Sequence, residues 1–379
     1  MIKIKSNNII LQNCKTAGCV YIENDKIVEI STVDKSADIT YDFTDKIVAP
    51  GFIDIHTHGG GGYAFANSSP SEVAQGCNYH LRFGSTSIVP TVSASAFSDM
   101  QKSLDNIHRA KVGRLAKNNI IGAHLEGPYL SKNQSGAQCP DFITPPIKDE
   151  YENLVKNYGS SITRWTYAPE NDNGEFCKYI TAHKIIASAG HTDATSDDMS
   201  RAIKCGCNLI THLYSCTSTV TRKQGFRSLG VVESAYLFED LTAEIIADGK
   251  HLPRDLIKMI VKIKGADKVI ATTDSLSVAG TKSGRGTMCG TDFIVEDGVA
   301  KLPDRSAFAG SVATANVLLK TLLDCGFSMP DCVKMLSTNP AKLLKLNKGE
   351  LKCGYDADII VLNDDLNIET AFVMGKKVV

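Results

Sequence analysis

Short hydrophobic runs separated by polar residues fill the first fifty positions of the chain. Runs such as 9–11, 20–22 and 26–28 are divided by Asn, Asp and Gly, which is typical of short strands joined by turns. The same pattern returns near the C-terminus, at 358–362 and 370–374. Both ends of the chain are therefore expected to form β-structure.

Strands at opposite ends of a chain can pair only if the segment between them folds back on itself. We therefore predict a small β-sandwich domain built from both termini, residues 1–50 and 347–379, beside a large central domain, residues 51–346. A chain of 379 residues is long enough for one large domain and one small one.

The central region alternates apolar, strand-like runs with helical stretches, which is typical of parallel strands joined by helical crossovers. The runs that read as strands are 47–58, 86–91, 120–126, 164–170, 184–190, 209–214, 243–248 and 268–274. Helical spacing is found at 71–83, 100–115, 196–205 and 254–263. Eight parallel strands with intervening helices predict an α/β fold, a (β/α)8 TIM-like barrel, with its active site at the carboxyl ends of the strands.

The first of these strands ends in two histidines, His56 and His58. Side chains alternate between the faces of a strand, so the two imidazoles point the same way, roughly 6.5–7 Å apart. They can converge on one divalent ion. The alternative is a pair of hydrogen-bonded core histidines, or a chance pair in a loop. Asp54 shares their face and could orient an imidazole through its free N–H.

Titratable residues also follow later strands. They are Glu126 on the third, His191 just past the fifth, His212 on the sixth, His251 three residues after the seventh and Asp274 on the eighth. The carboxyl ends of barrel strands meet around one opening, so we expect these side chains to face one cavity. Each residue alone is weak evidence, but their joint arrangement predicts a site.

This set of ligands suits two divalent ions about 3.5–4 Å apart. His56 and His58 would hold one ion, His191 and His212 would hold the other, and Glu126 would bridge them. Whether one ion or two are bound stays open.

Asp274 would complete the metal site as a second carboxylate. It would also take a proton from a bound water, whose pKa such an ion lowers to about 7, and return it to the leaving group. Imidazole and carboxylate ligands suit zinc, iron, cobalt and manganese alike, and zinc is the favoured ion.

The overall composition is that of an ordinary soluble protein, with 43% hydrophobic and 22% charged residues. A net charge of −1 gives no electrostatic case for nucleic acid or an anionic membrane as partner. The first residues lack the apolar core of a signal peptide, and no run is long enough to cross a bilayer. We expect a cytoplasmic protein whose twelve cysteines are mostly reduced.

An ordered set of motifs gives the chain a family resemblance. The motifs are GFIDIHTHG (51–59), HLEGP (124–128), YAPE (167–170), AGHTDAT (189–195), THLY (211–214), ADGKH (247–251), TTDS (272–275) and FAGS (308–311). Over nearly its whole length the chain resembles the amidohydrolase superfamily, and within it the N-acetylglucosamine-6-phosphate deacetylases. The resemblance implies hydrolysis of an acetylated amino sugar phosphate to acetate and the amino sugar phosphate.

The resemblance also implies roles for single residues. Asp274 would protonate the departing amine, and His251 would polarise the acetyl carbonyl and contact the substrate. Phe308, in the FAGS motif, is a further substrate-binding candidate. Members of the superfamily that use a carboxylated lysine need it at the end of the fourth strand, where this chain has Arg-Trp-Thr-Tyr-Ala-Pro-Glu. Hydrolases of cyclic amides are therefore disfavoured.

The family's phosphate-binding positions correspond here to Ser215, Cys216 and Arg222. In the family this arginine can come from a neighbouring subunit, which implies a homodimer; the alternative is a solvated loop charge. The match is weakest here, because the family usually has Asn-Ala-Met at 215–217, whereas this chain has Ser-Cys-Thr. Gln138 stands in the lid loop, where the family often presents a histidine to the sugar.

The chemistry is therefore retained more clearly than the recognition of substrate. Deacetylation of another N-acyl amino sugar, or of another N-acyl amino compound, is the first alternative. A catalytically silent barrel that only binds metal is the second. Asp274 and His251 argue against the silent barrel, because neither adds anything to a structural metal site.

Overall fold

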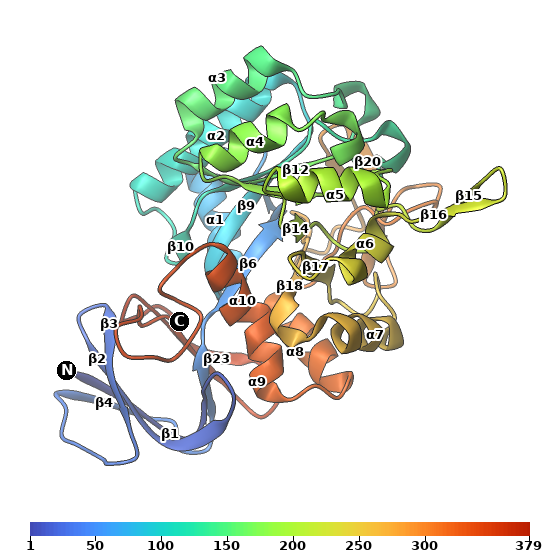
Figure 1. Cartoon of the computed structure of the whole chain (residues 1–379). Coiled ribbons are helices and arrows are strands. Elements are labelled where there is room, and N and C mark those ends of the chain that lie inside the picture. Colours follow the sequence, from blue (N-terminus) through green and yellow to red (C-terminus); the bar gives the residue numbers. More distant parts are fainter.

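The computed structural model describes residues 1–379, and its centre is a barrel of parallel strands surrounded by helices (Figure 1). The barrel strands are β6 (Phe52–Thr57), β9 (Ser85–Ser93), β10 (Asn119–Ile120), β11 (Ala123–Glu126), β12 (Ile162–Tyr167), β13 (Ile186–Ala189), β14 (Leu209–Ile210), β17 (Thr242–Ile246) and β18 (Val269–Thr272). Both β10 and β11 pair with β9, so they are two parts of one barrel strand. A parallel bridge between Thr57 and Ser275 links the last strand to the first. The predicted (β/α)8 barrel is confirmed.

Helices cover the outside of the barrel. They are α1 (Pro70–Leu81), α2 (Phe97–Val112), α3 (Lys148–Tyr158), α4 (Glu175–Ala182), α5 (Ser196–Lys204), α6 (Val231–Leu237), α7 (Arg254–Lys264), α8 (Ala315–Asp324), α9 (Met329–Val333) and α10 (Asn339–Leu343). Single turns of other helix types lie at Lys132–Gln134, Pro140–Phe142, Pro169–Asn171, Ala266–Lys268 and Lys334–Thr338. The four helices expected from spacing, α1, α2, α5 and α7, are present within a few residues of their expected ends. None of the helices is both long and apolar enough to span a bilayer.

The largest hydrophobic cluster, of 63 buried residues, packs the barrel against its helices. All six residues of β6 and all nine of β9 are buried, as expected for parallel strands covered on both faces. A capping box starts α5: the Thr195 hydroxyl accepts from the Asp198 N–H, and the Asp198 carboxylate accepts from the Thr195 N–H. These contacts hold the strand ends in fixed positions.

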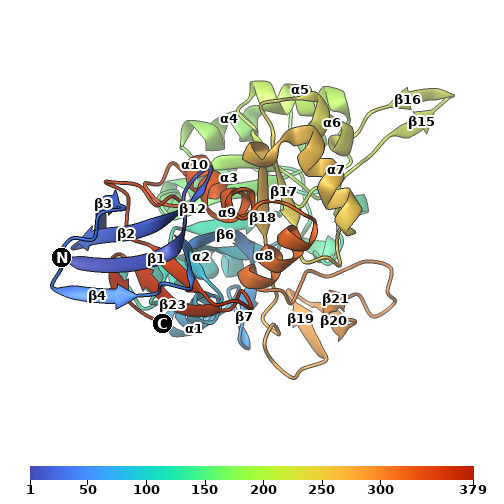
Figure 2. The ribbon, with the colours of Figure 1, turned by 90° about the horizontal axis from the view of Figure 1, so that it is seen from below.

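The two ends of the chain form one mixed sheet beside the barrel (Figure 2). Its strands are β1 (Ile2–Ile10), β2 (Lys15–Glu23), β3 (Lys26–Ser31), β4 (Ile39–Asp42), β5 (Ile47–Pro50), β22 (Ile359–Leu362), β23 (Ile368–Val373) and β24 (Lys376–Lys377). The antiparallel pairing of β5 with β22 joins the N-terminal strands to the C-terminal ones. The expected pairing of both termini is thus present, while the boundaries at residues 50 and 347 stay a prediction.

The sequence segment 47–58, expected to be one strand, is divided at Gly51. Residues before it pair with β22, and residues after it pair with β9. A Cβ at Gly51 would lie 2.0 Å from Thr86 Oγ1, so only glycine allows the chain to pass from one sheet to the other here.

Three small antiparallel units were not expected from the sequence. They are β7 (Gly59–Gly60) with β8 (Tyr63–Ala64), β15 (Thr221–Lys223) with β16 (Phe226–Ser228), and β19 (Arg285–Met288) with β20 (Thr291–Glu296) and β21 (Val299–Lys301). The β19–β21 sheet is inserted between β18 and α8. The β15–β16 hairpin projects from the body of the molecule in both views (Figures 1 and 2).

Candidate active site

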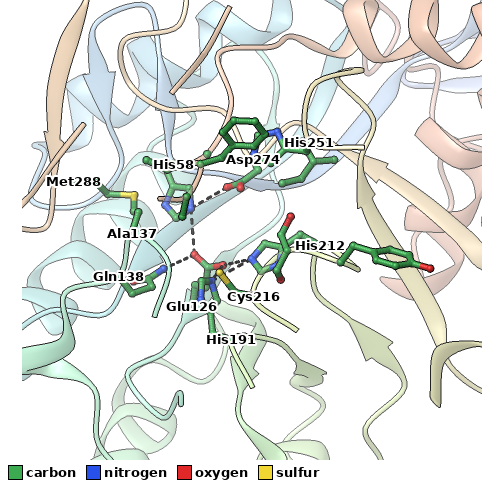
Figure 3. A pocket seen from close by; sticks show the side chains of 17 residues that line it. His58, Glu126, Ala137, Gln138, His191, His212, Cys216, His251, Asp274 and Met288 are labelled. Atoms are coloured by element: carbon green, nitrogen blue, oxygen red, sulfur yellow. Dashed lines mark hydrogen bonds and ion pairs between the residues drawn. The ribbon is translucent and has the colours of Figure 1, made fainter. Parts of the chain in front are cut away.

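Five side chains, at or just past the ends of four barrel strands, converge at the mouth of the barrel. Figure 3 shows four of them, His58, Glu126, His191 and His212. Glu126 Oε1 lies 3.1 Å from both His191 Nε2 and His212 Nε2. The same oxygen lies 3.3 Å from His56 Nε2, and Glu126 Oε2 lies 3.2 Å from His58 Nε2. Residues far apart in the sequence therefore share one centre, with Glu126 in its middle.

Each of the four imidazoles places its Nδ1 against an oxygen atom. The partners are Glu244 Oε1 for His56 (2.8 Å), Ser93 Oγ for His58 (3.0 Å), the Gln134 carbonyl for His191 (2.8 Å) and the Ser215 carbonyl for His212 (3.0 Å). A ring that donates from Nδ1 presents a lone pair at Nε2. All four lone pairs then point at the shared centre.

These residues fit one or two divalent ions. Two groups, His56–His58–Glu126 and Glu126–His191–His212, each have their ligand atoms within 4.8 Å of one another. His56 Nε2 and Asp274 Oδ1 are buried without a hydrogen-bond partner, which would be costly for a site with no other occupant. The predicted ligand set is thus brought together, and the roles of its members as ligands stay a prediction.

The charges of the site also favour a cation. Burial lowers the pKa of His56, but Glu126, Asp274 and Glu244 together raise it to about 10. Burial raises the pKa of Asp274, but His56 and His58 lower it to about 2. Burial likewise raises the pKa of Glu126, but the surrounding imidazoles hold it well below its usual value. Both carboxylates are therefore ionised, and they favour positive charge at the imidazoles, whether from protons or from a metal ion.

Several non-glycine residues at the strand ends have a left-handed backbone. The φ angles are 48° at His191, 29° at His212, 48° at Cys216 and 47° at Asp274. Such conformations cost on the order of 1–3 kcal/mol each and are found where a site must aim its side chains. Packing of the barrel holds these residues in place.

His251 and Phe308 form the wall next to the cluster. The Asp248 carboxylate accepts a hydrogen bond from His251 Nδ1 at 2.8 Å, so His251 Nε2 is left for the cavity. The rings of His251 and Phe308 meet edge to face with centroids 4.9 Å apart. Asp274, His251 and Phe308 line the same cavity.

The cavity has a volume of about 240 Å³, near the lower end of small-molecule sites, which span about 300–1,000 Å³. It is lined by the expected residues His58, Glu126, Gln138, His191, His212, Ser215, Cys216, His251, Asp274 and Phe308, among others. No Lys or Arg lines it. Arg222 lies outside, on the exposed β15 strand.

Two functional neighbours, Glu244 and Arg164, were missed by the sequence analysis. Both are completely buried and paired with each other, and Glu244 also accepts from His56. The expectation that Asp54 orients an imidazole is wrong. Its carboxylate accepts instead from the hydroxyls of Thr272 and Thr273. An acidic residue inside the apolar run of β17 was the available signal for Glu244.

His124 is excluded as a ligand, because its two ring nitrogens are already bonded. They lie 3.1 Å from Thr91 Oγ1 and 2.7 Å from Thr166 Oγ1. Burial holds the pKa of His124 well below its usual value, so the ring is neutral and packs edge to face against His56.

Comparison with known proteins agrees with this geometry. The sequence pattern of the Amidohydrolase family matches residues 47–378. The chain belongs to the amidohydrolase family. This amidohydrolase is 30% identical to the N-acetylglucosamine-6-phosphate deacetylase of Bacillus subtilis, over 99% of the chain and 95% of that protein. It is 28% identical to an N-acetylgalactosamine-6-phosphate deacetylase of Shewanella, over 89% of the chain and 84% of that protein.

One solved structure aligns with the whole chain of this amidohydrolase. It is the D267A mutant of the Mycobacterium smegmatis N-acetyl-D-glucosamine-6-phosphate deacetylase in complex with N-acetyl-D-glucosamine-6-phosphate. The TM-score is 0.93 at 26% identity, and 99% of that chain is covered. The agreement extends over both the barrel and the terminal sheet.

Proposed function

We propose that this amidohydrolase removes the acetyl group from N-acetylglucosamine 6-phosphate, giving glucosamine 6-phosphate and acetate. The observation that carries the proposal is that Asp274 and His251 face the same cavity as the histidine–glutamate cluster. Relatives and a solved structure with this activity cover nearly the whole chain. A barrel that only stored metal would need neither residue.

Asp274 is the proton carrier of the proposed reaction. It accepts the proton of the attacking water and then donates it to the nitrogen that leaves as the amine. Its Oδ1 lies 3.2 Å from His58 Nε2, at the edge of the cluster, and it is ionised before water attacks. The carboxylate is thus available as a base where the reaction begins.

His251 acts on the acetyl carbonyl. The Asp248 carboxylate holds the ring through Nδ1 and leaves Nε2 facing the cavity, where a hydrogen on Nε2 would be donated to the carbonyl oxygen as negative charge develops. Phe308 packs on His251, lines the cavity and is 40% exposed. We propose that it covers an apolar face of the substrate.

The residues that would hold divalent ions are His56, His58, Glu126, His191, His212 and Asp274. Zinc is our favoured ion, with iron, cobalt and manganese as the alternatives, and capacity for two ions comes from the shared Glu126. Such an ion would make water a stronger acid and polarise the carbonyl. Metal analysis of the purified protein, paired with reconstitution by each metal, tests this assignment.

The phosphate requires positive charge that the cavity itself does not have. Backbone N–H groups near Ser215 and Cys216 are the candidates within the chain. We propose that an arginine from a second copy completes the site and that the protein is a homodimer. Arg222 stands on the projecting hairpin, opposite Arg227 in the other strand, and Phe226 at its end is 80% exposed.

We also propose a cytoplasmic location. All twelve cysteines are free thiols, and seven of them are buried as small apolar residues. Free thiols in this number fit a reducing compartment.

The substrate assignment is tested with zinc-loaded protein and a panel of acetylated sugars. Acetate release is measured for the 6-phosphates of N-acetylglucosamine and N-acetylgalactosamine and for the same sugars without phosphate. We expect the first compound to have the highest kcat/KM and the unphosphorylated sugars the lowest. Absence of turnover with every 6-phosphate would overturn the proposal.

A different N-acetylhexosamine 6-phosphate is the second candidate. It is favoured by the departures from the family pattern at Ser215–Thr217 and by the similarity to an N-acetylgalactosamine-6-phosphate deacetylase. A higher kcat/KM for N-acetylgalactosamine 6-phosphate in the same panel would favour this second function. The catalytic residues are the same for both substrates, so the difference would come from substrate recognition.

A further inference from the structure

The side chain of Gln138 makes two hydrogen bonds at the edge of the cluster, and Figure 3 shows the one to Glu126. Its Nε2 donates to Glu126 Oε2 at 2.7 Å, and its Oε1 accepts from the Ala94 N–H at 2.9 Å. A backbone N–H can only donate, so Oε1 must face Ala94. Nε2 must therefore face Glu126, and the orientation of the amide is determined. Only 2% of the residue is exposed.

The other neighbours of the Glu126 carboxylate are imidazole nitrogens. His56, His191 and His212 approach Oε1, while His58 approaches Oε2. When these rings act as ligands their Nδ1 atoms carry the hydrogens, so each Nε2 offers a lone pair and no donor. Gln138 is then the one hydrogen-bond donor that reaches this carboxylate.

We propose that Gln138 is a positioning residue for Glu126, and that it does not bind the sugar as the sequence suggested. Its amide fixes the plane of the carboxylate, so that Oε1 faces His191 and His212 and Oε2 faces His58. This inference rests on the metal-dependent function proposed above. Removing a partner that orients a metal ligand typically weakens metal binding by about 10- to 100-fold.

Replacement of Gln138 by methionine tests this role, because methionine has a similar length and no donor. Zinc affinity is measured by competition with a chromophoric chelator, and the visible spectrum of bound cobalt reports on ligand geometry. The matched control is Gln101→Met on α2, where the side chain is at the surface and donates to Asn153 Oδ1 at 3.1 Å. We expect Gln138→Met to weaken zinc binding by about tenfold or more, and Gln101→Met to leave it unchanged.

Steady-state kinetics separate positioning from substrate binding. With zinc in excess, Gln138→Met should recover kcat and keep the wild-type KM for N-acetylglucosamine 6-phosphate. A raised KM with unchanged zinc affinity would show that Gln138 binds substrate and would overturn the inference. Unchanged zinc affinity together with unchanged KM would also overturn it.

A second variant keeps the proposal testable if Gln138→Met does not fold. Gln138→Ala leaves room for a water to accept from the Ala94 N–H, and it should show the same loss of zinc affinity. Failure of the proposed function itself looks different, because the wild-type protein would then take up no ion or hydrolyse no substrate. If wild type does both and the two variants bind zinc as tightly as wild type, only the positioning role fails.

Discussion

Glu244 accepts a hydrogen bond from His56 Nδ1 at 2.8 Å, across the inside of the barrel and 188 positions further along the chain. Its other oxygen contacts the guanidinium of Arg164, and all three side chains are completely buried. Arg164 also donates to the hydroxyls of Ser188 and Thr211. The buried ion pair and its hydrogen bonds thus link four barrel strands, β6, β12, β13 and β17, and fix the ring of a candidate metal ligand.

Replacement of Glu244 by glutamine should destabilise the protein strongly. The amide oxygen can still accept from His56, but Arg164 would be left as a buried charge without a counter-ion. Loss of one partner of such a pair typically costs about 3–5 kcal/mol. The free energy of unfolding, measured by urea denaturation of the metal-free proteins, checks this.

The exposed pair between Arg254 and Asp324 gives a matched control for Glu244→Gln. Both side chains are more than half exposed, and Asp324→Asn should change the free energy of unfolding by less than about 1 kcal/mol. Equal effects of the two substitutions would show that the buried pair adds nothing beyond a surface contact.

Asp274→Asn should abolish turnover while leaving metal bound. The amide keeps the shape of the side chain but cannot carry a proton, and loss of general acid–base catalysis costs about 10²- to 10⁴-fold in rate. kcat and metal content are measured on the same preparation. Wild-type kcat in this variant would remove Asp274 from the mechanism, and lost metal would show that it acts mainly as a ligand.

The site could be predicted from the sequence because barrel geometry brings strand ends together. His56, His191 and His212 each follow a recognisable apolar run, so their convergence followed from the fold class alone. Contacts inside the barrel could not be predicted in this way. These contacts depend on the stagger between neighbouring strands. The alternation of side chains along a strand places Asp54 and His56 on one face, but it does not show which carboxylate reaches the His56 imidazole.

The pattern of hydrophobic and polar residues predicted neither the three small antiparallel units nor the break between two strands at Gly51. The three strands of β19–β21 are short and partly exposed, and β20 has an apolar run of only three residues, 293–295, so they gave a weaker signal than the barrel strands. The change of sheet at Gly51 depends on the close approach of Thr86, which is distant in the sequence. Likewise nothing in the sequence shows that Gln138 lies beside Glu126.

The role of the β15–β16 hairpin is tested by mixing two inactive variants. In a homodimer that donates Arg222 across the interface, Asp274→Asn and Arg222→Ala chains complement each other, because one site of a mixed dimer has both residues. Random mixing should restore about a quarter of wild-type activity. Size-exclusion chromatography with light scattering measures the oligomer, and Lys223→Ala is the control on the same hairpin.

Two results would contradict the complementation scheme. Mixtures that stay inactive although the chains exchange would place the arginine in its own subunit. Full activity of Arg222→Ala alone would exclude Arg222 from phosphate binding, and Arg227→Ala would then be mixed in its place, because the two arginines are cross-strand neighbours.

His80 should make the protein less stable as the pH falls below neutrality. Its Nε2 donates to the Gly59 carbonyl at 2.8 Å, and its Nδ1 is buried without a partner. Burial lowers the pKa of His80 below its usual value of 6.5, while Asp54 and the hydrogen bond to Gly59 act in the opposite direction. The folded protein thus keeps this ring neutral at a pH where the unfolded chain protonates it.

The unfolded chain binds the extra proton, so the contribution of His80 is complete above pH 6.5 and is lost as the pH falls toward the folded-state pKa. Within that window it adds a slope of up to about 1.4 kcal/mol per pH unit to the free energy of unfolding. His80→Gln keeps a donor for Gly59 and cannot titrate, so the difference in slope between wild type and variant isolates the effect. Both proteins are measured in the same metal state, because the cluster histidines titrate in the opposite sense. Identical slopes between pH 5 and pH 7 would show that His80 is protonated equally in both states.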